Sequence, residues 1–315
     1  MKLPIRFLLA TGWLAAIAVP ASHAKIERVV EKTFTVRPGG TLHVETQGGN
    51  ISVEPSNDGV VKITAKEKIR ANSDSEAEEI LKKLTLTMEQ SGNAVFAEAK
   101  YEKTFSGIHF GSWPPVQVDF VVSVPATFAT DLKTSGGDIT VGDLAAKVHA
   151  RTAGGDIKLD HISADVDAST SGGNVSLAEG NASVLLRTSG GNVSVGRAVG
   201  PADLSTSGGD IKVDSVENTL RATTSGGDVR AGFAGALKGS CVLSTSGGKV
   251  TATVDKAAGF HLDASTSGGD VEADGLAIAI EHGGQDRSRL AGDVNGGGPL
   301  LKLRSSGGDV VIKAR

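Results

Sequence analysis

The chain has 315 residues, of which 42 are glycine, whereas phenylalanine, tryptophan and tyrosine number only 9, 2 and 1. An ordinary globular core of this length would use more large aromatic side chains, so the composition favours a thin core of Val, Ala, Leu and Ile. The formal net charge of −4 argues against nucleic acid and anionic membrane surfaces as partners.

Residues 1–24 have the pattern of a secretory signal peptide. Lys2 and Arg6 give a positive start, residues 7–19 form an apolar run, and a small-x-small cleavage motif ends the segment. A membrane anchor is the alternative, but the run is shorter than the ~20 residues that a spanning helix needs. We predict an exported protein, periplasmic or extracellular, with no stable membrane insertion after cleavage. The remaining 25–315 carries 30 basic and 36 acidic residues, a net charge of −6.

Strand-like alternation occupies residues 25–72 and includes a first copy of a glycine-rich repeat at 48–53. An insertion at 65–125 then interrupts the repeats. Within it, Ser73 and Glu76 predict a capping box at the start of one short helix. We expect this insertion to cap one end of a repeat array, because exposed strand edges promote aggregation.

The insertion also contains a loop in which aromatic residues are concentrated. These residues are candidates for a ligand contact with a glycan or protein of the cell surface: Tyr101, Phe105, Phe110 and Trp113. The alternative is that the loop is a hydrophobic cover for the end of the array.

Residues 126–275 form the main array of the repeat, whose model copy is Thr-Ser-Gly-Gly-Asp-Ile-Thr-Val at 134–141. Its glycine pairs recur every 18 residues and later every 21, starting at Gly136, Gly154, Gly172, Gly190, Gly208, Gly226, Gly247 and Gly268. A constant period with strand-type residues indicates a repeat architecture. We assign the glycines to corners, where a positive φ would be free only for glycine.

Around each glycine pair, apolar and polar residues alternate with a period of two. The threonine two residues before each pair shares the parity of the apolar positions, so we expect it inside. Cys241, the single cysteine, falls on the same parity and is predicted to be a buried thiol.

Two all-β architectures fit this alternation. The glycine pairs could close hairpins in an antiparallel meander, but so many strands in one flat sheet would expose a continuous apolar face. A parallel β-solenoid (β-helix) with coils of 18–21 residues avoids this, because each coil folds back and covers its own apolar side chains. We predict the solenoid, with residues 276–315 as an irregular coil and a last strand at 309–313 that finish its second end.

An acidic residue follows many of the glycine pairs, and such residues would stack at ~4.8 Å in parallel coils. Asp138, Asp156, Asp210 and Asp228 are therefore candidate calcium ligands. The alternative is that each Asp accepts hydrogen bonds from the backbone of its own turn. The spacing also differs from that of calcium-binding nonapeptide repeats, which place Gly and Asp at alternate positions.

The pattern Thr-Ser-Gly-Gly-Asp/Asn-Ile/Val-x-Val resembles a family of bacterial exported β-strand-repeat proteins, grouped as a domain of unknown function and labelled putative adhesin. The resemblance also covers the entry strand Val118–Pro125, the tail Ala291–Pro299 and the final copy Ser306–Asp309. It implies a β-helical exported scaffold, and it supplies no catalytic residues.

Catalytic motifs do not emerge from the sequence. His149 and His161 lie 12 residues apart with no third ligand beside them, and the array offers only Phe233 and Phe260 as a platform for sugar rings. We predict a non-enzymatic structural or interaction module of the cell envelope, without a cofactor. A calcium-stabilised binding module and a polysaccharide-degrading enzyme are the alternatives.

Overall fold

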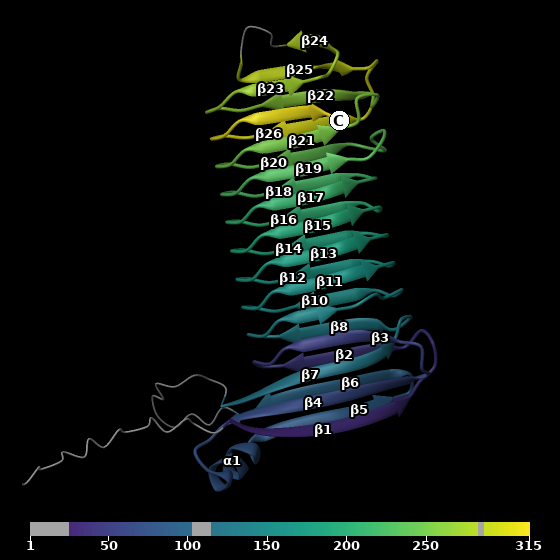
Figure 1. Ribbon diagram of the computed structural model, residues 1–315, viewed down its shortest axis with the longest axis vertical. Helices are drawn as coiled ribbons and strands as arrows, with labels where there is room; N and C mark the ends of the chain where they lie inside the picture. Colours follow the sequence, from purple (N-terminus) through teal and green to yellow (C-terminus); the bar gives the residue numbers. More distant parts are fainter. Residues whose placement is uncertain (1–24, 103–114, 283–286) are drawn as a thin grey trace, which may run out of the picture.

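The computed structural model describes residues 25–102, 115–282 and 287–315. The predicted signal segment 1–24 lies outside these residues. Within them, the chain winds into a long stack of coils with two facing sheets (Figure 1). Sheet A has 13 described strands in the order β1-β4-β7-β3-β9-β11-β13-β15-β17-β19-β21-β27-β23. Sheet B has 14 described strands in the order β24-β25-β22-β26-β20-β18-β16-β14-β12-β10-β8-β2-β6-β5.

Each coil of the main array contributes one strand to each sheet. The strands in sheet B are β8 (Ala129–Thr134), β10 (Val148–Arg151), β12 (Val166–Ser169), β14 (Val184–Arg187), β16 (Ala202–Ser205), β18 (Leu220–Thr223) and β20 (Cys241–Ser244). Those in sheet A are β9 (Ile139–Val141), β11 (Ile157–Ile162), β13 (Val175–Gly180), β15 (Val193–Ala198), β17 (Ile211–Val216), β19 (Val229–Phe233) and β21 (Val250–Val254). The glycine pairs lie at the corner between the two strands of one coil.

Neighbouring coils are parallel and in register. Val148 of β10 pairs with Val166 of β12, which pairs with Val184 of β14, so equivalent residues of the 18-residue period lie side by side. This confirms the predicted parallel solenoid, and the antiparallel hairpin reading is wrong for the array. Because every coil repeats the same pattern, one register satisfies the backbone hydrogen bonds and the burial of apolar side chains together.

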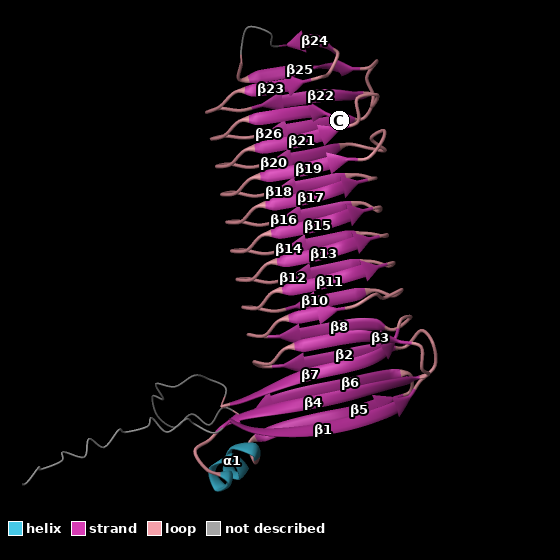
Figure 2. Cartoon of the chain, in the orientation of Figure 1, coloured by secondary structure: helices cyan, strands magenta, loops and turns pink. Residues whose placement is uncertain are grey.

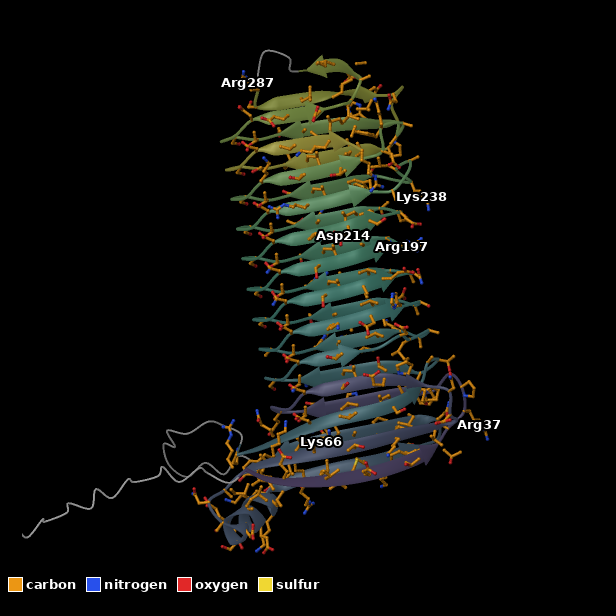
Figure 3. All side chains as sticks on the ribbon, viewed as in Figure 1. Arg37, Lys66, Arg197, Asp214, Lys238 and Arg287 are labelled. Carbon is orange, nitrogen blue, oxygen red and sulfur yellow. The ribbon has the colours of Figure 1, made fainter. Side chains whose placement is uncertain are left out.

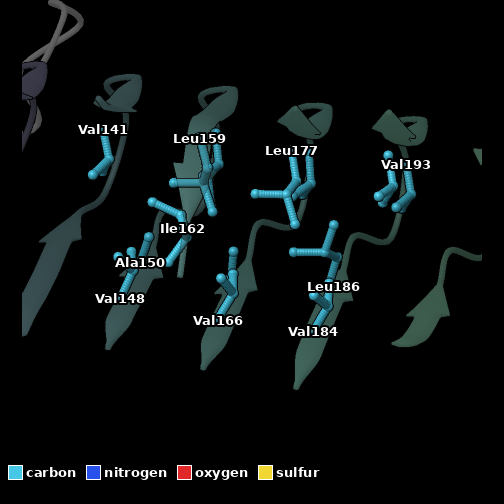
Figure 4. Packing of buried hydrophobic residues seen from close by; sticks show 14 of the residues in the cluster. Val141, Val148, Ala150, Leu159, Ile162, Val166, Leu177, Val184, Leu186 and Val193 are labelled. Carbon is cyan, nitrogen blue, oxygen red and sulfur yellow. The ribbon is translucent and has the colours of Figure 1, made fainter. Parts of the chain in front are cut away.

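The core is a thin layer of small aliphatic side chains between the sheets (Figure 4). In one coil Val148, Ala150, Ile157, Leu159 and Ile162 are all at most 1% exposed. The threonines before the glycine pairs are also buried, as expected from their parity. Cys241 is a buried free thiol, and burial raises its pKa, which confirms the prediction of an inward-facing cysteine.

The physical role that we assigned to the corner glycines needs correction. Among the described residues, the glycines with positive φ all lie outside the Gly-Gly corner pairs. At the second glycine of each pair the constraint is space, because a Cβ on Gly173 would clash with the carbonyl oxygen of Gly155 in the preceding coil. A Cβ on the first glycine, Gly172, would approach nothing closer than 3.5 Å. The second glycine therefore allows the coils to stack closely.

The first end of the stack consists of longer, mostly antiparallel strands: β1 (Lys25–Thr35), β4 (Val60–Arg70), β5 (Leu84–Ser91), β6 (Ala94–Tyr101) and β7 (Val116–Pro125). The coil of the first repeat copy, β2 (Thr41–Thr46) and β3 (Ile51–Ser56), is not the outermost coil. It lies between β8/β9 on one side and β6/β7 on the other.

The helix α1 (Asp74–Leu81) lies at this end, beyond the long strands (Figure 2). Ser73 is its N-cap, and its Oγ accepts a hydrogen bond from the Glu76 amide at 3.2 Å. The Glu76 carboxylate accepts a hydrogen bond from the amide of Asn72, one residue before the N-cap. Ala77 is its buried side chain, so the helix packs shallowly on the end of the core.

At the second end the chain order and the spatial order also differ. The strands are β22 (Phe260–Ser265), β23 (Val271–Asp274), β24 (Ile278–His282), β25 (Arg289–Val294), β26 (Leu300–Arg304) and β27 (Val310–Ala314). The last coil, β26/β27, is inserted between β20/β21 and β22/β23. The prediction that the last strand finishes this end is therefore wrong. That coil has a complete Ser-Ser-Gly-Gly-Asp corner that bonds to a corner on each side, while antiparallel β25 and β24 lie beyond β22.

Candidate functional site

Two ladders of side-chain hydrogen bonds run along the glycine corners. In the inner ladder, the Oγ1 of each corner threonine donates to the carbonyl oxygen of the second glycine in the preceding coil: Thr188 to Gly173 at 2.8 Å, for example. The same Oγ1 accepts from the amide of the second glycine in its own corner, as Thr188 does from Gly191 at 3.3 Å. Thr188 therefore satisfies two backbone groups that the tight corner leaves without strand partners.

The outer ladder contains the predicted calcium ligands. The Oδ1 atoms of Asp138, Asp156, Asp210 and Asp228 each accept a hydrogen bond, at 2.7–2.8 Å, from the backbone amide of the equivalent residue in the next coil. The alternative, in which each Asp accepts hydrogen bonds from the backbone of its own turn, is therefore wrong. Each of these carboxylates accepts its hydrogen bond from a backbone amide of the neighbouring coil. Within the described ranges, these aspartates are not brought together as a group of three potential metal ligands.

Of the predicted aromatic contact residues, Phe105, Phe110 and Trp113 lie outside the described residues. Tyr101 ends β6 and is 9% exposed, and its backbone amide donates to Gln47 Oε1 at 3.0 Å. Burial raises the pKa of its phenol. The Tyr101 side chain belongs to the hydrophobic core of the first end.

The outward face of sheet B contains a shallow hollow over β14, β16, β18 and β20, with a volume of about 670 Å³. Leu185, Asp203, Arg221 and Val242 cross it in register, one from each strand. Arg187 borders it on the same face. The hollow offers two guanidinium groups, one carboxylate and two apolar side chains to a ligand, and its volume is within the ~300–1,000 Å³ of typical ligand sites. The sequence alternation places these side chains outward, but only the register aligns them.

Histidines and aspartates alternate in another column of the same face. His43, Asp131, His149 and Asp167 are consecutive cross-strand partners on β2, β8, β10 and β12. Asp131 lies between the two histidines, with its oxygens 3.1 Å from His43 Nδ1 and 3.3 Å from His149 Nδ1.

The histidine pair considered from the sequence is not a joint site. His161 is on sheet A, where it pairs with Asp143 at 2.8 Å, and this hydrogen bond raises its pKa. Also on that sheet, Arg197, labelled in Figure 3, lies between Glu179 and Glu217 of the neighbouring coils, at 3.4 and 2.6 Å. Charged side chains on the outward face of sheet A are thus paired between neighbouring coils at these positions.

Sequence reasoning missed one buried acid. Glu67 of β4 has a fully buried side chain, and burial raises its pKa although Arg28 Nε lies 2.8 Å from its Oε2. The signal is present in the sequence, because Glu67 continues the inward parity of Ile63, Ala65 and Ile69. An ion pair at such a position is expensive to desolvate, so it contributes little net stability.

An array of parallel two-strand coils with open outer faces defines a β-solenoid repeat protein. No helix in the described part of the chain is long and apolar enough to cross a membrane. The chain belongs to the Toastrack DUF4097 family, whose model matches residues 40–313.

No curated protein matches the chain in sequence. Among solved structures, it is similar to a putative adhesin from Bacteroides fragilis NCTC 9343, with 12% identity over 91% of this chain and 97% of that chain and a TM-score of 0.43. It is also similar to a putative lipid binding protein from Parabacteroides distasonis ATCC 8503, with 11% identity, the same two coverages and a TM-score of 0.40. A putative cell adhesion protein from Clostridium sporogenes ATCC 15579 has 12% identity over 91% of this chain and 100% of that chain, with a TM-score of 0.22.

Proposed function

We propose that the protein is an exported, non-catalytic interaction module of the bacterial cell envelope, which binds an extended glycan or protein on the outward face of sheet B. The observation that carries this proposal is the open hollow over β14–β20, where side chains from four successive coils align. An extended ligand lying along the stack would meet a new side chain at every coil, about 4.8 Å apart.

The chemistry of the hollow favours an anionic ligand with some apolar surface. Arg187 and Arg221 are exposed and can bind carboxylate, sulfate or phosphate groups in a bidentate manner. Leu185 and Val242 are half-buried and offer apolar contact beside them. Asp203 lies between Leu185 and Arg221 in the column and would discriminate against ligands with negative charge at that position.

Binding of the purified chain to a glycan panel and to cell-envelope fractions tests this function. The double variant Arg187→Ser, Arg221→Ser should weaken binding at least tenfold, whereas Lys158→Ser, Lys212→Ser on the outward face of sheet A changes the net charge equally and should leave it intact. Equal loss in both variants would indicate only non-specific electrostatic attraction and would overturn the proposed face. Fractionation of the host cell tests export.

The two alternative functions have separate tests. For a calcium-stabilised module, millimolar calcium should raise the melting temperature by several degrees. We do not expect calcium to raise the melting temperature through the outer ladder, because one oxygen of each candidate Asp already accepts a hydrogen bond from a backbone amide. For a polysaccharide-degrading enzyme, incubation with the glycan panel should release reducing ends.

A further inference from the structure

Three potential metal ligands converge at the second end of the stack. We infer that His261, Glu281 and Asp293 form a binding site for one divalent transition-metal ion, for which zinc is the best fit. One ligand atom from each of these residues lies within 4.8 Å of those from the other two, and they are the only such group of three among the described residues. This site is independent of the hollow proposed as the binding face.

The strand pairing brings these residues together across three adjacent strands. His261 of β22 is the direct cross-strand partner of Asp293 of β25, and its Nδ1 lies 2.8 Å from Asp293 Oδ1. On the other side of β25, Ala279 of β24 is the partner of Asp293. Glu281 follows two residues later, where the register shifts between Ile280 and His282. The Glu281 carboxylate still lies within 4.8 Å of the other two ligand atoms.

The backbone around Asp293 leaves its carboxylate little freedom. A Cβ on Gly297 would lie 3.0 Å from the Asp293 Cγ, and Gly297 has a φ of +82°, so a glycine is required where the chain packs against this side chain. The Asn295 amide group donates to the carbonyl oxygens of Lys256 and Ala258, each at 2.9 Å, which ties this turn to the segment that precedes β22. A metal ligand held by both its strand and the following turn loses little entropy on binding.

The charges around His261 favour a cation. Three acidic side chains, Glu281, Asp293 and Asp263, lie near His261. Asp263 itself is paired with Arg304, so Glu281 and Asp293 are the two carboxylates left to bind an ion. A metal ion bound here would take the place of the contact between His261 Nδ1 and Asp293 Oδ1.

The ligand set distinguishes between metals. One imidazole with two carboxylates suits zinc and its first-row neighbours, whereas calcium prefers six to eight oxygen ligands. Ligand atoms at ~2.0–2.1 Å from a tetrahedral zinc ion lie roughly 3.3 Å from one another. Small side-chain rotations would therefore bring the three ligand atoms of this site to that spacing. The three ligands leave one tetrahedral position open to solvent. Bound metal would cross-link β24 and β25 to β22 and thereby fasten the end of the stack.

Titration calorimetry of the full chain, freed of metal with a chelator, tests the site with zinc chloride as the probe. We expect one equivalent of zinc per chain in wild type, and at least tenfold weaker binding in both His261→Gln and Asp293→Asn. The matched control is His149→Gln, because His149 also lies on the outward face of sheet B beside two aspartates, and it should bind zinc as wild type does. Circular dichroism establishes that each variant is folded.

A second measurement tests whether Glu281 binds the metal ion or only lies near it. Zinc should slow amide hydrogen exchange in β24 and β25 of wild type, and Glu281→Gln should abolish this protection in β24. The proposal is overturned if wild type shows no saturable binding, if His261→Gln binds as tightly as wild type, or if His149→Gln weakens binding as much as His261→Gln. Zinc binding without protection of β24 would exclude Glu281 and overturn the three-strand site.

Discussion

The carboxylate oxygen Oδ1 of Asp156 lies 2.7 Å from the backbone nitrogen of Asn174, the residue that holds the same corner position one coil later. The Asn174 Oδ1 in turn accepts from the amide of Asn192 at 2.8 Å. A short Asx side chain thus completes the backbone pairing between coils at the point where strand pairing is interrupted. Charge is not needed for this role, which explains why Asp and Asn both occur in the column.

Asp156→Ala is expected to destabilise the protein by about 0.5–1.5 kcal/mol, because it removes the acceptor of the Asn174 amide at a solvent-exposed corner. Asp156→Asn keeps the acceptor oxygen and should stay within about 0.5 kcal/mol of wild type. Urea unfolding monitored by circular dichroism measures both variants. Equal losses for Ala and Asn would show that the carboxylate charge, not the hydrogen bond, matters here.

Gly173→Ala should be among the most harmful single substitutions in the array. Its methyl group would clash with the Gly155 carbonyl, so two coils must separate locally, and we expect a loss above about 4 kcal/mol or failure to fold. The adjacent Gly172→Ala is the matched control, because its nearest contact would be at 3.5 Å, and it should change stability little. Similar melting temperatures for the two variants would contradict the close-stacking role of the second glycine.

Thr188→Val tests the inner ladder. Valine has the shape of threonine but leaves the Gly173 carbonyl and the Gly191 amide unpaired, so we expect a loss of about 1–3 kcal/mol in thermal or urea unfolding. Thr188→Ser should retain most of the stability, since Ser305 makes the equivalent bond to the Gly248 carbonyl at 2.8 Å. A valine variant as stable as wild type would mean that the packing of this side chain, and not its hydroxyl group, stabilises the corner.

Removal of residues 300–315 should loosen the second end selectively. The inserted coil β26/β27 joins β20/β21 to β22/β23, so its loss leaves facing strand edges unpaired on both sides. Hydrogen exchange should show lost protection in residues 260–294 and unchanged protection in the coils from 148 to 231. Full protection of 260–294 in the truncated chain would show that β22 pairs directly with β20 instead.

The His161–Asp143 pair predicts a dependence on pH. Hydrogen bonding to Asp143 raises the pKa of His161 above 6.5, while the same contact lowers the pKa of Asp143. The contribution of His161 to stability is therefore complete below its unfolded pKa and is lost as the pH rises through its raised folded pKa. The contribution of Asp143 is lost as the pH falls through its lowered folded pKa. In NMR titration, Asp143→Asn should bring the His161 pKa back down, and an unchanged pKa would refute the pair.

The repeating part of the fold follows from the amino-acid sequence. Every coil from β8 to β21 presents the same alternation and the same corner, so the parallel register, the buried threonines and the buried Cys241 all follow from the period and parity of the chain. Local chemistry also predicted the α1 N-cap at Ser73. These features depend on residues near one another in sequence or on identical positions one period apart.

Where the 18-residue period breaks, the arrangement of the strands depends on contacts between distant segments. The insertion of β26/β27 between β20/β21 and β22/β23, and the meeting of His261, Glu281 and Asp293, depend on pairings between dissimilar segments. The tertiary structure also decided the role of the second corner glycine and the partner of each Asp Oδ1, because both lie in the neighbouring coil. The physical reason is that a strand edge accepts any segment with a compatible hydrogen-bonding pattern. Only the packing and the closure of all edges together select one partner.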